Sequence, residues 1–129
     1  MKRVFVDTGA WYSLVDAKDP DHRAVAACLA EYHGRLATSN FVFDETVTLL
    51  RYRLDYRAAR TFGATLLAGG LGPVLRVTPA DEAGAWEIFT RYRDKHFSFT
   101  DCTSFALIKR LAIGGAVAID DDFRAFGIP

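Results

Sequence analysis

Short apolar segments alternate with longer helical patterns along the whole chain, and this alternation limits the possible folds more than any other feature. Apolar runs at residues 2–7, 35–39, 73–78 and 116–119 predict strands. Apolar residues at helical spacing predict a short helix through Trp11 and Leu14 and then helices over 19–33, 41–54, 56–68, 80–93 and 101–111. Strands that alternate with helices are typical of α/β domains. We therefore predict an α/β fold with a largely parallel sheet.

The length and composition predict one globular domain spanning residues 1–129. Half of the residues are apolar and a quarter are charged, which is ordinary globular usage. The 16 basic and 16 acidic residues cancel, so an overall basic surface for nucleic acid is excluded, although a local one is not. No apolar run reaches the roughly 18 residues of a membrane span, so no membrane partner is expected. With only two cysteines, in no metal-like spacing, the expected location is the cytoplasm.

Two carboxylates follow predicted strands at the same edge of the sheet. Asp7 ends the first strand in "VFVDTG", and Asp120 ends the fourth in "AVAIDDDF". Ligands of open α/β sheets bind outside the carboxyl ends of the strands, near the point where strand order reverses. If the two strands are neighbours, Asp7 and Asp120 can meet there.

Two further acids lie near helix starts at that edge. Glu45 lies in the first turns of the helix after "TSN", and Asp101 opens the helix after "FSFT", on one face with Ser104. The adjacent Asp44 projects about 100° away from Glu45 around the helix, so Glu45 is favoured over Asp44 as the site residue. Each acid alone also fits a structural role, such as a partner for a helix dipole. Four acids at consistent edge positions favour a shared site.

A cluster of four carboxylates requires compensating charge. Two carboxylates about 4 Å apart repel by roughly 4 kcal/mol at an effective dielectric constant near 20. Oxygen ligands suit hard ions, so Mg²⁺ is the expected cofactor and Mn²⁺ is an alternative. Such ions activate water and stabilise displacement at phosphorus. The acids therefore indicate metal-dependent phosphodiester hydrolysis.

Four stretches of the chain form a recognisable set, namely "VFVDTGAWYSLVDAKDPDH", "TSNFVFDETVTLL", "FSFTDCTSFALIKRL" and "AVAIDDDFRAFGI". Together they resemble the PIN-domain ribonucleases, specifically the toxins of VapBC-type bacterial toxin–antitoxin systems. Each motif is short, but their order and spacing cover essentially the whole chain. The resemblance implies a three-layer α/β/α PIN-like fold and an acidic pocket that binds Mg²⁺ or Mn²⁺. It also implies endonucleolytic cleavage of RNA, a homodimer and neutralisation by a small antitoxin.

The resemblance also implies which residues form the site. Its catalytic and metal-binding acids are Asp7, Glu45, Asp101 and Asp120, and its supporting residues are Thr8, Thr100, Ser104 and Asp122. Thr8 is the expected hydroxyl partner of the first acid, and Thr100 precedes the third. The family often has a basic or polar residue two positions after its fourth acid, whereas this chain has Asp122. Asp121 and Asp122 are therefore candidates to share or replace the work of Asp120.

Two other classes of function compete with the nuclease. Receiver-like and phosphatase-like domains also place acids at strand ends around Mg²⁺ for phosphoryl transfer. A haloacid-dehalogenase-type phosphatase needs a second Asp two residues after the first, where this chain has Gly9. A receiver domain has a pair of acids near its first strand, whereas the first predicted strand of this chain ends on Asp7 alone. A catalytically silent PIN-like scaffold is disfavoured because all four acidic positions are filled.

Overall fold

The computed structural model describes residues 2–129, which form four strands and seven helices. In chain order the elements are β1 (Val4–Val6), α1 (Thr8–Val15), α2 (His22–Glu31), β2 (Leu36–Ser39), α3 (Asn40–Arg53), α4 (Tyr56–Leu67), β3 (Val74–Leu75), α5 (Pro79–Arg91), α6 (Phe99–Leu111), β4 (Gly115–Val117) and α7 (Asp122–Ala125). The strands form one parallel sheet in the order β3-β2-β1-β4. Within the described residues, no helix has the length and apolar character to cross a membrane.

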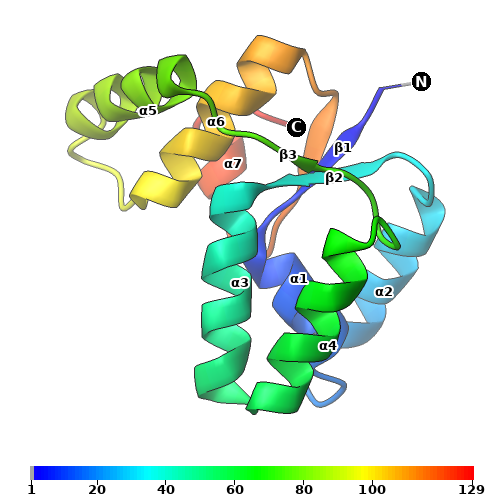
Figure 1. Cartoon of the computed structure of the whole chain (residues 1–129). Coiled ribbons are helices and arrows are strands. Elements are labelled where there is room, and N and C mark those ends of the chain that lie inside the picture. Colours follow the sequence, from blue (N-terminus) through cyan, green and yellow to red (C-terminus); the bar gives the residue numbers. More distant parts are fainter. Residues whose placement is uncertain (1) are drawn as a thin grey trace.

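The order of the strands reverses beside β1. Val4 pairs with Leu36 of β2 on one side and with Gly115 of β4 on the other. The chain moves outward through β2 and β3 and then returns to place β4 against β1. Because parallel crossovers are right-handed, this path puts α1 to α4 on one face of the sheet and α5 to α7 on the other (Figure 1). The predicted α/β fold with a parallel central sheet is confirmed, and the reversal falls where Asp7 and Asp120 follow their strands.

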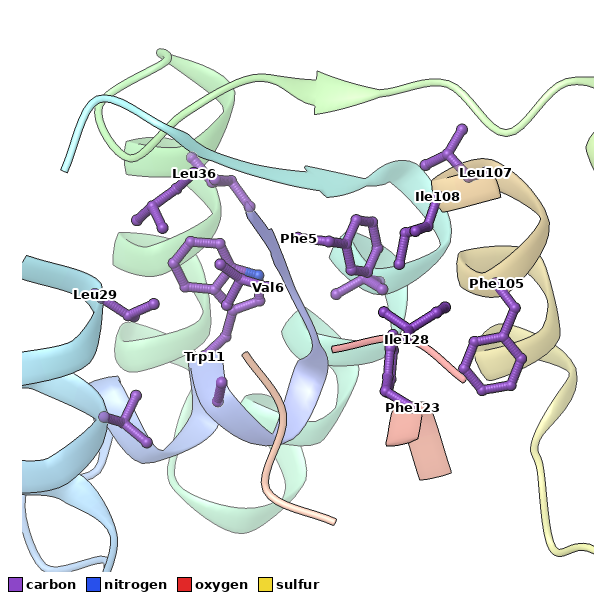
Figure 2. Close-up of a cluster of buried hydrophobic side chains, with 14 of the residues drawn as sticks. Phe5, Val6, Trp11, Leu29, Leu36, Phe105, Leu107, Ile108, Phe123 and Ile128 are labelled. Carbon is purple, nitrogen blue, oxygen red and sulfur yellow. The ribbon is translucent and has the colours of Figure 1, made fainter. Parts of the chain in front are cut away.

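The core lies on both faces of β1, because successive strand residues point in opposite directions. Val6 and Phe5 are fully buried, with Val6 facing the Trp11 side and Phe5 the Phe123 side (Figure 2). On the first side the rings of Trp11 and Phe62 lie 5.5 Å apart. On the second side Phe123 lies 5.0 Å from Phe105. The strand that ends at Asp7 is therefore held rigidly between two packed layers.

Side-chain caps set several helix starts. Ser39 accepts a hydrogen bond from Val42 N (3.1 Å) at the start of α3, and Asp55 accepts one from Ala58 N (2.7 Å) at the start of α4. Such caps satisfy amide groups that have no partner inside the helix. The cap on α3 fixes where the helix begins and therefore where Glu45 lies.

Several predicted boundaries are wrong. The first strand is Val4–Val6 rather than 2–7, and the third is Val74–Leu75 rather than 73–78. The fourth ends at Val117, so Asp120 lies three residues beyond it and not directly at its end. The helix predicted over 19–33 is limited to His22–Glu31, and the one predicted from 101 begins at Phe99 because Ser98 caps it. Helix α7 was not predicted, and at its start Asp120 Oδ1 accepts a hydrogen bond from Asp122 N (3.1 Å).

Candidate active site

Asp7 lies in the junction between β1 and α1, where it is buried. Its amide donates to the carbonyl of Val117 in β4 (3.0 Å), and its carbonyl accepts from Trp11 N (3.1 Å). The main chain is thus fixed, while the side chain makes no capping bond to α1. Among residues 2–129, nothing donates a hydrogen bond to the buried Oδ1 atom of Asp7. A buried polar atom without a partner is costly, so this oxygen is suited to a ligand.

Thr8 connects the first acid to the second. Its hydroxyl, which is buried, donates to Glu45 Oε1 at 2.5 Å. Glu45 is half-buried on α3, whereas its neighbour Asp44 is exposed. The bond orients the Glu45 carboxylate toward the end of β1 and leaves its second oxygen open.

Asp101 is buried at the third position of α6, in a reciprocal capping arrangement with Ser98. Asp101 N donates to Ser98 Oγ and Ser98 N donates to Asp101 Oδ2, both at 3.0 Å. Asp101 therefore has a structural role at the start of α6. The capping bond occupies its Oδ2 atom and leaves Oδ1 available.

A second acid in the same local arrangement shows what is special about Asp101. Asp81 forms the equivalent capping box with Thr78 at the start of α5. Asp81 also receives two hydrogen bonds from Arg110, at 2.8 and 2.9 Å, and these bonds hold its pKa below the ordinary value. Asp101 forms no ion pair with a described cation. One capped acid is thus neutralised within the fold, and the other is not.

Asp120 to Asp122 form an exposed turn that enters α7. Asp120 is exposed and its Oδ1 accepts a hydrogen bond from Asp122 N, while Asp121 pairs with Arg124 at 3.3 Å. Asp122 is half-buried, and burial followed by the charge of Asp120 raises its pKa. Asp121 therefore faces its own cation, whereas Asp120 and Asp122 contribute to the acidic field.

The charges of the other three predicted acids all raise the pKa of Asp7. Burial is the largest cause, and together with the charges of Asp101, Glu45 and Asp120 it raises the pKa of Asp7 to about 8, against the lowering effect of the Thr8 amide. Burial likewise raises the pKa of Asp101 to about 6, with contributions from Asp120 and Asp122. The structure thus brings all four acids into one electrostatic neighbourhood.

The carboxylates do not form a closed ligand set. Within residues 2–129, no group of three or more acid, histidine or cysteine side chains has a geometry that would hold a metal ion. The donor chemistry nevertheless suits a hard cation, because the available atoms are carboxylate and hydroxyl oxygens and Asp7 Oδ1 has no other partner. A cation would need to draw these side chains closer together.

The remaining predicted residues have different positions. Ser104 is fully buried and donates to the carbonyl of Thr100 (3.1 Å), which also accepts from Thr103 (2.6 Å). Ser104 and the Thr100 carbonyl therefore serve α6 itself. Ser98 was missed, although the pattern Ser-x-x-Asp is a readable capping signal. His96 was not assigned to the site, yet its charge lowers the pKa of Asp122 and it therefore lies near the acids.

Comparison with known proteins identifies the family of the chain. The PIN domain model matches residues 4–129. The 23S rRNA-specific endonuclease VapC20 of Mycobacterium tuberculosis is 39% identical over 124 residues, which cover 96% of this chain and 94% of the relative. Ribonuclease VapC26 of the same organism is 27% identical, covering 91% and 86%. The crystal structure of VapC20, a sarcin–ricin loop cleaving toxin, superimposes with a TM-score of 0.92 at 36% identity, covering 98% of this chain and 96% of that one. The chain therefore belongs to the PIN-domain family, among its VapC-type ribonucleases.

Proposed function

We propose that this protein is a metal-dependent endoribonuclease whose active site is the acidic pocket at the ends of β1 and β4. The observation that carries the proposal is the buried carboxyl of Asp7. One of its oxygens has no partner in the described chain, and three other acids raise its pKa. A fold does not retain such a group for stability, so a ligand is the natural explanation. The family match removes support for the receiver and phosphatase alternatives.

Mg²⁺, or Mn²⁺ in its place, is the proposed cofactor. Asp7, Asp101, Asp120 and Glu45 would hold it, with Asp122 as an auxiliary acid. When bound, the ion supplies an activated water and offsets charge at the scissile phosphate. Asp7 holds a proton near neutral pH because its pKa is about 8, so cation binding would release that proton. Thr8 would keep Glu45 in position through the hydrogen bond to Oε1.

The proposed substrate is ribosomal RNA. The support is the 39% identity to an endonuclease specific for 23S rRNA, over nearly the full length of both chains. A sarcin–ricin loop is the first RNA to test, because the structural relative cleaves one. Proteins read such loops by shape and by stacking on unpaired bases. Ribosomal RNA lies in the cytoplasm, which is the proposed location.

The proposed partners are a second copy of the chain and a small antitoxin. An antitoxin arginine is the expected occupant of the acidic pocket, because a guanidinium pairs bidentately with carboxylates. Two apolar hollows lie next to each other between α1, α2 and α4, and both are lined by Leu14 and Leu71. Together they offer a surface for an apolar antitoxin helix. We propose that the whole range 1–129 is the nuclease domain and that its toxicity depends on release from this partner.

Incubation of the purified protein with 23S rRNA tests the proposed activity. Cleavage is expected in Mg²⁺ or Mn²⁺ and is expected to stop in EDTA. Intact RNA in every metal would support a catalytically silent scaffold, and equal cleavage in EDTA would refute the metal dependence. Light scattering at micromolar concentration tests the homodimer, which a monomer mass would contradict.

A further inference from the structure

A hollow of about 600 Å³ follows the outer strand of the sheet, and the proposed chemistry leaves it unexplained. It lies along β4, which pairs with β1 on one side and with no described strand on the other (Figure 1). The run 114–118 lines it from the strand, Cys28 lines it from α2, and Arg124 lines it from α7. We call this hollow the β4-edge groove.

Cationic side chains line the β4-edge groove, and no acid from residues 2–129 does. The four cations are Lys2, Arg3, Arg35 and Arg124. Lys2 and Arg3 are exposed and form no ion pair with a described residue. Arg35 donates through Nε to the carbonyl of Lys2 (2.9 Å), which leaves its terminal nitrogens without a partner in the described chain. Arg124 pairs with Asp121 at 3.3 Å, but these side chains are 81% and 90% exposed, where such a pair is weak.

The groove separates positive from negative charge along the sheet. Lys2 and Arg3 precede β1 and Arg35 precedes β2, so these cations lie at the amino ends of the strands. Asp7 and Asp120 instead follow the carboxyl ends of β1 and β4. The chain as a whole has no net charge, so the groove is a local concentration of cations. Like charges repel one another, so this concentration is not explained by the stability of the fold.

The β4-edge groove leads to the acidic pocket. Val117 and Ala118 line its far end, and the carbonyl of Val117 accepts the hydrogen bond from Asp7 N (3.0 Å). Asp120 follows Ala118 by two residues, which span at most about 7 Å. From Gly114 to Ala118 the chain rises by about 13 Å. A polyanion in the groove would therefore extend from the cations to the acids.

We propose that the β4-edge groove binds the phosphate backbone of the RNA next to the bond that is cut. This inference deepens the proposed function and rests on it. Lysine and arginine side chains that contact phosphates fix the register of a nucleic acid without reading its sequence. The lining run Gly-Gly-Ala-Val-Ala has only small side chains, so a sugar–phosphate backbone can approach β4 closely.

Charge favours RNA over a protein segment as the occupant of the groove. An extended peptide can add to an open strand edge, but it takes its specificity from pockets for alternate side chains. The small residues of β4 offer no such pockets, and the four cations would select only an acidic peptide. A peptide that continued past Ala118 would then meet Asp7 and Asp120. RNA instead brings a phosphate to the position where a bound cation can offset its charge.

The salt dependence of RNA binding tests the groove. A labelled RNA hairpin that carries a sarcin–ricin loop is titrated with the full-length protein in EDTA, and anisotropy is measured at several salt concentrations. Each phosphate contact contributes about 0.7–0.9 to the slope of log K against log salt. In Arg3→Gln/Arg124→Gln the slope should therefore fall by about 1.4–1.8, and affinity in about 0.1 M salt should fall at least about tenfold. An unchanged slope and affinity would overturn the proposal.

Two more double variants make the result specific. Lys2→Gln/Arg3→Gln keeps the pair between Arg124 and Asp121 and should lose as much of the slope. Arg51→Gln/Arg60→Gln is the matched control, because it removes the same charge from exposed positions on α3 and α4. Its affinity should stay within about twofold of wild type. Circular dichroism checks that each variant is folded. Equal losses in the groove variants and in the control would refute the groove, because net charge alone would then explain the binding.

Further outcomes separate the possible errors. If Arg3→Gln/Arg124→Gln binds RNA like wild type but no longer binds an oligoglutamate peptide, the groove takes an acidic protein segment and the proposal is wrong. If the wild type cleaves 23S rRNA in Mg²⁺ while both groove variants bind RNA normally, the groove fails and the nuclease proposal stands. If the groove variants lose RNA binding but the wild type cleaves RNA in no metal, the groove stands and the nuclease proposal fails.

Discussion

Replacing Asp101 by Asn is expected to stabilise the metal-free protein near neutral pH, even though Asp101 caps α6. The pKa of Asp101 rises from its ordinary value of 3.8 to about 6. A shift of about two units corresponds to roughly 3 kcal/mol of cost for the charged form. The amide of Asn can still accept a hydrogen bond from Ser98 N, but without charge assistance, which costs about 1 kcal/mol. The expected net gain in the free energy of unfolding is about 1–2 kcal/mol.

The pH dependence distinguishes this explanation from a simple loss of a helix cap. Because its pKa is higher when folded, the folded state retains the Asp101 proton longer than the unfolded chain does. The wild type therefore loses stability as pH rises from about 4 through 6, and Asp101→Asn escapes that loss. Urea unfolding in EDTA should show the variant less stable than wild type near pH 4 and more stable at about pH 8.

Asp81→Asn is the matched control, because Asp81 has the same capping geometry but also pairs with Arg110. Its pKa is lowered, chiefly by the Arg110 hydrogen bonds, so its contribution is present at neutral pH and lost in acid. This variant should lose about 1–3 kcal/mol near pH 7, with a smaller loss toward pH 3. Equal destabilisation of Asp101→Asn at every pH would show that Asp101 acts only as a cap.

Three further predictions concern the cation, the hydroxyl partner and the fold. Adding Mg²⁺ should raise the Tm of wild type more than that of Asp101→Asn, because a ligand stabilises only the state that binds it; equal shifts in calorimetry would argue against Asp101 as a ligand. Thr8→Val should slow RNA cleavage at least about tenfold while Thr8→Ser retains it, because only the hydroxyl can bond to Glu45; single-turnover rates for both variants decide this. Gly72→Ala should lower the free energy of unfolding by about 2 kcal/mol or more, because φ is +135° and the added Cβ would lie 2.3 Å from the carbonyl oxygen of Leu36. Urea unfolding measures this change, and unchanged stability would contradict it.

The sequence was sufficient to predict the positions of features that depend on local pattern. The apolar run before Asp7 indicated a buried strand that ends in an acid, and the alternation of strands and helices indicated the parallel sheet. The different directions of the two side chains on the helix favoured Glu45 over Asp44, and the structure places only Glu45 against Thr8. That contact joins residues 37 positions apart, so it depends on how α3 packs and has no local signal.

Features that depend on competing interactions were harder to predict. Strand β4 ends at Val117, three residues before Asp120, and an acidic run such as "DDD" does not reveal that a helix begins within it. Asp81 and Asp101 share one local pattern, in which a Thr or Ser three residues earlier caps the helix. They differ in that Arg110 forms hydrogen bonds with Asp81 and not with Asp101. No sequence rule assigns that arginine, which is 29 residues from Asp81. The raised pKa of Asp7 likewise arises from tertiary burial.

If the acids at the ends of β1 and β4 carry out RNA cleavage, removing the charge of one of them must stop the reaction, whereas the same change at a matched acid elsewhere must not. Single-turnover cleavage of 23S rRNA in Mg²⁺ is measured for wild type, Asp101→Asn and Asp81→Asn, after circular dichroism has shown that all three are folded. We expect a loss of at least about a hundredfold for Asp101→Asn, because charge is removed where it is needed in the reaction. For Asp81→Asn we expect a rate within about threefold of wild type, because this carboxylate serves Thr78 and Arg110. Cleavage by Asp101→Asn at the wild-type rate would show that this acidic pocket is not the site of the reaction.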